Sequence, residues 1–122
     1  MGDAHYNLAK LYKQIGDPDA ALNTYKHLLT LVPERQDALV NMGNIHFDNG
    51  SLEKAIVCLK KASMVNSGNN QLTDQAIINL ANTYRRQGED VRAIQTYERV
   101  LSIQCYAGLR IKQAITLPVV YR

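Results

Sequence analysis

The chain has 122 residues, of which 46% are hydrophobic and 20% charged, with 14 basic against 11 acidic side chains. This length excludes a second full domain, and the balance of apolar and charged residues is typical of a folded chain rather than a disordered one. The net charge is only +3 and the basic residues are spread along the sequence, so we expect neither nucleic acid nor a membrane as a partner.

The first predicted element is a pair of helices over residues 2–35. Its first half carries an apolar stripe with the i, i+3, i+4, i+7 spacing of a helix, formed by His5, Leu8, Ala9 and Tyr12. Gly16 follows where a helix needs a left-handed residue to end, and Asp17-Pro18 is typical of a new helix start. A second stripe of Ala21, Leu22 and Tyr25 then predicts an antiparallel partner helix.

The same layout occurs twice more, over residues 36–69 and 74–107. Tyr6-Asn7-Leu8-Ala9 aligns with Val40-Asn41-Met42-Gly43 at an offset of 34 and, after a further 38, with Ile78-Asn79-Leu80-Ala81. Gly50 and Gly88 repeat the turn of Gly16. A single helical hairpin cannot bury both of its stripes, so we expect the three hairpins to stack on one another.

These three units resemble the tetratricopeptide repeat, whose pattern W-x2-L-G-x2-Y…A-x3-F…P they follow in register. The resemblance implies an all-α fold, a right-handed superhelical solenoid of three helix-turn-helix repeats. It also implies a protein-interaction module that holds a protein or peptide ligand, an activity that needs no cofactor.

Two segments lie outside the three units. Residues 70–73 are an insertion that could add one helical turn or lengthen a loop; Gly68 and the paired asparagines beside it favour the loop. After residue 107, Ile111, Ala114 and Ile115 keep the helical register until Pro118. We therefore predict a separate C-terminal capping helix over residues 108–117 and a tail over residues 118–122.

Catalytic chemistry has little support in the sequence. The common phosphate-loop, dinucleotide, zinc-protease and nucleophile-elbow signatures are absent, so we expect this chain alone not to be an enzyme. Cys58 and Cys105 stand 47 positions apart without a C-x-x-C pair, which predicts neither a disulfide framework nor a metal site. The N-terminus lacks the layout of a signal peptide, and we expect a cytoplasmic, intracellular location.

The second stripe of each first helix, on the side away from the core, carries the candidate binding residues. It is rich in asparagine, which is unfavourable in the middle of a helix and whose amide can pair with the peptide groups of an extended chain. In the repeat family this stripe lines the concave groove. The predicted peptide-binding residues are Tyr6, Asn7, Lys10, Lys13, Val40, Asn41, Asn44, Phe47, Ile78, Asn79, Asn82, Arg85 and Arg86.

Three narrower hypotheses remain open. The asparagine strings resemble the superhelical arm of O-linked N-acetylglucosamine transferases, which implies a non-catalytic substrate-recruiting arm of a larger enzyme. A co-chaperone clamp for a C-terminal carboxylate is less favoured, because its five clamp positions here hold Tyr6, Lys10, Asn41, Gln75 and Asn79, and only Asn41 matches. Exposed terminal repeats could also let the chain associate with itself.

Overall fold

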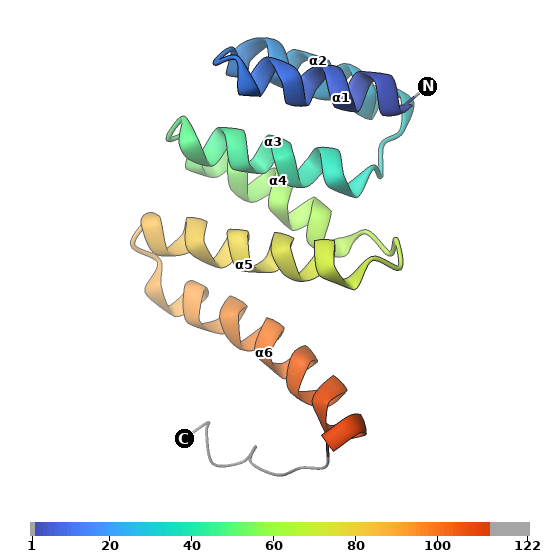
Figure 1. The fold of residues 1–122 in the computed structure, drawn as a ribbon. Coiled ribbons are helices and arrows are strands. Elements are labelled where there is room, and N and C mark those ends of the chain that lie inside the picture. The colour runs from blue at the N-terminus through green and yellow to red at the C-terminus, as the bar shows by residue number, and fades with distance from the viewer. Residues whose placement is uncertain (1, 113–122) are drawn as a thin grey trace.

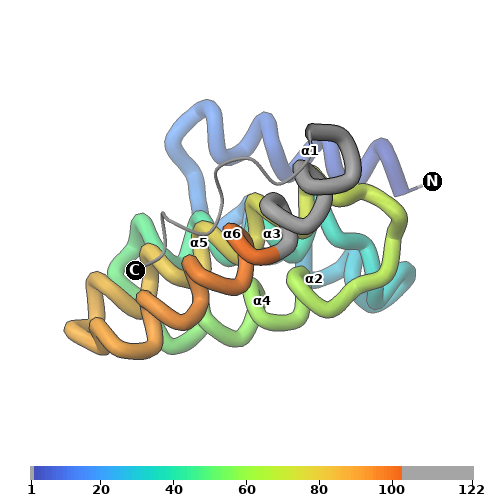
Figure 2. Tube along the Cα trace, turned by 90° about the horizontal axis from the view of Figure 1, so that it is seen from below, coloured from blue at the N-terminus to red at the C-terminus, as the bar shows by residue number. Residues whose placement is uncertain are grey.

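The described part of the chain is a stack of three helical hairpins (Figure 1). The computed structural model describes residues 2–112, and the side chains of residues 2–102. The helices are α1 (Gly2–Gln14), α2 (Pro18–Leu31), α3 (Gln36–Asp48), α4 (Leu52–Met64), α5 (Asn70–Arg86) and α6 (Asp90–Lys112). The described residues form no strand, which confirms the all-α solenoid of three helix pairs. Viewed from below, the successive hairpins overlie one another (Figure 2).

The three turns within the hairpins share one geometry. Gly16, Gly50 and Gly88 have φ values of 89°, 83° and 86°, in the left-handed region that glycine enters without a steric penalty. In the first turn the amide of Asp17 donates to the Tyr12 carbonyl at 2.9 Å and that of Gly16 to the Lys13 carbonyl at 3.1 Å. The same two bonds recur in the other turns, so all three are Schellman motifs, as the glycine spacing predicts.

Small residues allow the two helices of each hairpin to approach closely. Ala21, Ala55 and Ala93 are at most 2% exposed. Gly43 is more constrained, because a Cβ atom at this position would lie 2.6 Å from Cγ of Leu59. The second hairpin therefore requires glycine at this position, whereas the other two hairpins have alanine at the equivalent positions, Ala9 and Ala81.

The core continues through the stack rather than forming a separate cluster in each hairpin. One buried cluster joins Ala9 of α1, Tyr25 of α2 and Met42 of α3, and another joins Leu59 of α4, Leu80 of α5 and Ala93 of α6. A third cluster fills the space between α3, α4 and α5. This continuity is the stacking that the paired apolar stripes predict.

The insertion over residues 70–73 is helical, so the expectation of a longer loop is wrong. It forms the first turn of α5, which has 17 residues where α1 and α3 have 13. The Asn69 side chain caps this turn by accepting a bond from the Leu72 amide at 3.0 Å. Four residues are about one helical turn, so Leu72 reaches the core while the apolar face keeps its direction.

The expected separate capping helix is also corrected as far as the structure describes it. Residues 108–112 continue α6 without a break, so no new helix begins at residue 108. Residues 113–117 and the tail over residues 118–122 lie outside the described residues. The third hairpin therefore has a second helix of 23 residues, longer than its counterparts of 14 and 13.

Candidate functional site

The predicted binding residues lie on α1, α3 and α5, and we call this surface the A-helix face. Twelve of the thirteen are at least partly exposed. Val40 is the exception: it is 4% exposed and packs with Leu39, Ala62 and Ala76, so its assignment as a ligand contact is wrong. The equivalent residues of the neighbouring repeats, Tyr6 and Ile78, remain half-buried.

A pocket of about 270 Å³ lies on this face between the second and third repeats. It brings together four of the predicted residues from two helices, Asn44 and Phe47 of α3 with Asn79 and Asn82 of α5. Three further residues that the sequence analysis did not assign complete its lining: Gln75, Thr83 and Leu59.

The amides in the pocket form a hydrogen-bonded series. Gln75 Nε2 donates to Asn79 Oδ1 at 2.9 Å, and Asn79 Nδ2 donates to Asn44 Oδ1 at 2.8 Å. The Tyr97 hydroxyl donates to Asn82 Oδ1. The Thr83 hydroxyl donates back to the Asn79 carbonyl, a bond of 2.8 Å that stays within α5. These contacts fix the amide orientations and join the second repeat to the third.

Arg86 supplies a positive charge at the edge of this pocket. Its Nη1 donates to the Phe47 carbonyl at 2.7 Å, and its guanidinium carbon lies 4.8 Å from the centre of the Phe47 ring. The hydrogen bond and the cation–π contact together hold the Arg86 guanidinium over one wall of the pocket. The neighbouring Arg85 is exposed. Sequence spacing alone places Arg86 on this face, but not against Phe47.

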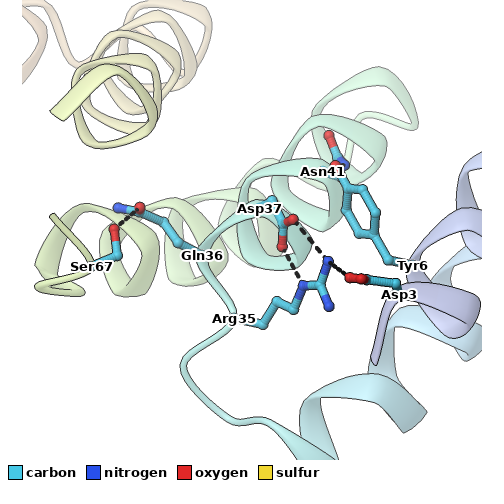
Figure 3. A network of polar contacts seen from close by, with 7 residues as sticks. All are labelled: Asp3, Tyr6, Arg35, Gln36, Asp37, Asn41 and Ser67. Atoms are coloured by element: carbon cyan, nitrogen blue, oxygen red, sulfur yellow. Dashed lines mark hydrogen bonds and ion pairs between the residues drawn. The ribbon is translucent and has the colours of Figure 1, made fainter. Parts of the chain in front are cut away.

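The A-helix face between the first and second repeats is closed by side chains of the protein itself. Asn41 Nδ2 donates to the Tyr6 hydroxyl at 2.9 Å, which joins α3 to α1 (Figure 3). The guanidinium of Arg35 lies 4.8 Å from the Tyr6 ring centre, and the Lys10 ammonium lies 5.3 Å from it. Asn7 and Lys13 are exposed beyond this contact.

Arg35 is a residue that sequence reasoning missed. It forms ion pairs with Asp37 at 2.8 Å and Asp3 at 3.0 Å (Figure 3). Its pKa is raised, chiefly by the hydrogen bond to Asp37. The sequence does contain a pattern that could have predicted these ion pairs. Arg35 stands just before the second repeat, and Asp3 and Asp37 occupy the same position in the first two repeats. This cluster occupies the end of the A-helix face near the N-terminus of α1.

Beneath the contact between Tyr6 and Asn41 lies the ring of Tyr25. The Tyr25 side chain is fully buried, and its hydroxyl has no hydrogen-bond partner among the described residues. Burial raises the pKa of this hydroxyl to about 12, and the nearby Asn41 amide offsets only part of that rise. The first interval of the A-helix face thus has a filled interior, whereas the second has a pocket.

Metal-binding groups and membrane-spanning helices are not found among the described residues. No group of three or more His, Cys, Asp or Glu side chains within the described part of the chain is placed to hold a metal ion. None of the helices over residues 2–112 combines the length and apolar character needed to cross a membrane. Cys58 is half-buried rather than buried, and desolvation raises the pKa of its thiol. Cys105 lies beyond the described side chains.

Comparison with known proteins agrees with this architecture. The chain is 29% identical over 96 residues to Tetratricopeptide repeat protein 8 of Caenorhabditis elegans, which covers 79% of this chain and 18% of that protein. It therefore spans less than a fifth of this relative's length. The N-terminal domain of stress-induced protein-1 (STI-1) from C. elegans has a similar fold, with a TM-score of 0.77 at 20% identity, covering 83% of this chain and 82% of that one.

The family itself is matched over most of the sequence. Tetratricopeptide repeat families match residues 34–105 and residues 4–39. These matches span all three hairpins, and the first alone covers more than half of the chain. The repeated glycine turns, the small residues between paired helices and the continuous core are the features that the repeat requires. This chain belongs to the tetratricopeptide repeat family.

Proposed function

We propose that this chain binds an extended peptide along its A-helix face, with the pocket between α3 and α5 as the central contact. Family membership supports a protein-interaction module without catalysis of its own. The observation that carries the proposal is the pocket itself, where amides from two repeats converge. Amide side chains bind main-chain groups of any sequence, so the ligand's backbone provides affinity and its side chains provide preference.

Not every asparagine on the face is equally available to a ligand. Asn41 is engaged with Tyr6, and Asn79 both donates to Asn44 and accepts from Gln75. The NH₂ groups of Asn44 and Asn82 donate no bond to any described residue. The structure therefore directs the test toward Asn44 and Asn82.

The test is a random peptide array probed with the purified chain. We expect the double variant Asn44→Ala with Asn82→Ala to lose most of the peptides that the unchanged chain binds. Asn23→Ala with Asn66→Ala is the matched control, because both side chains are exposed away from the A-helix face. Thermal unfolding of both variants separates lost binding from lost folding. An unchanged set of bound peptides in a folded Asn44/Asn82 variant would refute the proposal.

A second candidate is the substrate-recruiting arm of a glycosyltransferase. Asparagines at the same two positions of the second and third repeats, Asn41 with Asn44 and Asn79 with Asn82, are all partly exposed on one face, which supports it. Reading the gene beyond Arg122 tests it: a downstream glycosyltransferase domain would support this candidate, and another domain or a stop codon would exclude it.

The co-chaperone clamp has less support. The likeness to the STI-1 domain at 20% identity concerns the fold alone. One clamp position holds Tyr6, whose phenol has no ammonium group of the kind that such a clamp needs. Its hydroxyl is also bonded to Asn41, and its ring lies against Arg35.

A further inference from the structure

We infer that the pocket between α3 and α5 takes the carboxylate of an aspartate or glutamate side chain from the bound peptide. This inference rests on the proposed function, since it names the side chain that selects among peptides on the A-helix face. It depends on three properties of the pocket, which are its hydrogen-bonding balance, its charge and its size.

The hydrogen-bonding balance of the pocket favours an acceptor. The side-chain oxygens of Asn44, Asn79 and Asn82 each already accept a bond from a neighbouring residue. The NH₂ groups of Asn44 and Asn82 donate none within the described part of the chain, so their hydrogens remain for a ligand. An apolar side chain would bury these donors without partners, which costs free energy.

The charge around the pocket favours an anion. None of its lining residues carries a formal charge, and the Arg86 guanidinium is held beside Phe47 at its edge. Asp48 and Asp74 are next to lining residues in sequence, but neither lines the pocket. Hydrogen bonds from amide or guanidinium groups to a carboxylate are stronger than those to a neutral acceptor. The pocket therefore discriminates between glutamate and glutamine, which have nearly the same shape.

The pocket has room for a side chain of a bound peptide. Its volume is about 270 Å³ and it lies open on the A-helix face. A peptide running along α3 and α5 could place one side chain in it. Between the first and second repeats, by contrast, the buried Tyr25 ring fills the interior and Asn41 bridges to Tyr6.

The experiment compares matched peptides on the same protein. Each array peptide that requires Asn44 and Asn82 is resynthesised with its acidic residues changed singly, Glu→Gln or Asp→Asn, and its dissociation constant is measured. We expect one acidic position per peptide to matter, with about a tenfold loss of affinity on neutralisation. That loss should shrink as salt is added, because salt screens the charge of Arg86.

A protein variant reverses the chemistry of the pocket without changing its shape. Asn82→Asp replaces an NH₂ donor by a carboxylate, so we expect the acidic peptide to lose its advantage over the neutral one. Asn23→Asp is the matched control, because Asn23 is exposed on α2 away from the A-helix face, and it should leave the preference unchanged. The folded state of each variant is checked by thermal unfolding.

The outcomes separate this inference from the proposed function. If neutral peptides bind as tightly as acidic ones while Asn44 and Asn82 are still required, the carboxylate assignment is wrong and the A-helix face remains the binding surface. If no peptide depends on Asn44 and Asn82, the proposed function itself fails. A preference for the acidic peptide that survives in a folded Asn82→Asp variant would place the carboxylate outside the pocket and overturn the inference.

Discussion

Tyr25, Leu59 and Tyr97 occupy the same position in the second helices of the three repeats but have different surroundings. Tyr25 is fully buried and its hydroxyl has no partner among the described residues, Leu59 lies against Gly43 beneath the pocket, and Tyr97 donates its hydroxyl to Asn82. Burying a hydroxyl without a partner costs about 1–3 kcal/mol, whereas a paired one contributes about 1 kcal/mol. The same side chain therefore has opposite effects on stability at two equivalent positions.

Replacing each tyrosine by phenylalanine tests this difference. We expect Tyr25→Phe to raise the free energy of unfolding by up to about 1 kcal/mol, because it removes an unpaired buried hydroxyl. Tyr97→Phe, the matched control, should lower it by about 1 kcal/mol through loss of the bond to Asn82. Urea unfolding measures both. Destabilisation by Tyr25→Phe as large as that of the control would show that the Tyr25 hydroxyl is paired.

His46 links the stability of the protein to pH. It is 8% exposed, and its pKa is lowered first by burial and then by Lys54 and Lys26. The unfolded chain therefore binds a proton at His46 at a higher pH than the folded chain does. It follows that the free energy of unfolding falls as the pH drops below the ordinary histidine value of about 6.5 and continues to fall until the folded pKa is passed.

The measurement is the urea midpoint between about pH 7.5 and about pH 5.5, the range in which histidine titrates. We expect His46→Tyr to reduce the fall in the free energy of unfolding at low pH, because it removes the buried histidine. Tyrosine should fit at this position, since Tyr12 and Tyr84 occupy it in the other repeats. His27→Gln, which replaces an exposed histidine on α2, is the control variant. An equal fall in the unchanged chain and in His46→Tyr would assign the effect to other groups.

At the scale of the elements, the first turn of α5 depends on Gln36 at the start of α3. Gln36 is 4% exposed; its Nε2 donates to the Ala62 carbonyl at 2.8 Å and to Thr73 Oγ1 at 2.9 Å, and its Oε1 accepts from the Ser67 hydroxyl at 2.6 Å. One side chain thus holds the end of α4, the following loop and the inserted turn. The insertion is helical because this buried amide and Leu72 both anchor it.

We expect Gln36→Ala to lower the free energy of unfolding by about 2 kcal/mol, since several bonds are lost and the Ala62 carbonyl is left without this partner. Amide hydrogen exchange in residues 70–73 should quicken more than exchange in α4. Gln71→Ala, in the same turn but exposed, is the control and should change neither quantity. Unchanged exchange in residues 70–73 of the Gln36 variant would mean that Leu72 alone holds the turn.

At the scale of the whole molecule, the first hairpin leaves an apolar stripe uncovered. Leu8, Leu11 and Ile15 on α1 are 43%, 53% and 68% exposed. The residues equivalent to Leu8 and Leu11 are at most 5% exposed in the later repeats: Met42 and Ile45 on α3, and Leu80 and Thr83 on α5. The preceding hairpin packs against α3 and α5 and covers these residues.

This stripe predicts self-association that grows with concentration. We expect sedimentation equilibrium to show a rising average mass, and the double variant Leu11→Lys with Ile15→Lys to remain monomeric, since charges on the stripe cannot be buried unpaired. Val57→Lys changes an exposed apolar residue on α4 and serves as the control. A monomer at every concentration, or association that persists in the double variant, would contradict the prediction.

Much of this architecture followed from periodicity. Each of three features reflects a local geometric requirement and could therefore be predicted from residue type and spacing. These features are the apolar stripes, the three glycines and the small residues between helices. Twelve of the thirteen predicted binding residues are at least partly exposed on one face for the same reason. Val40 was misassigned because its burial depends on Ala62 and Ala76, which belong to other helices.

The repeat, its turns and the face that carries the asparagines follow from the amino-acid sequence alone, because each depends on the spacing of residues along the chain. Contacts between helices are needed to explain which asparagines donate no bond to a described residue, where the pocket lies and why residues 70–73 are helical. Those properties depend on contacts such as that of Asn44 with Asn79, of Tyr25 beneath Asn41, and of Gln36 with Thr73. Each of these contacts joins residues from different helices, so the spacing of residues along a single helix does not predict it.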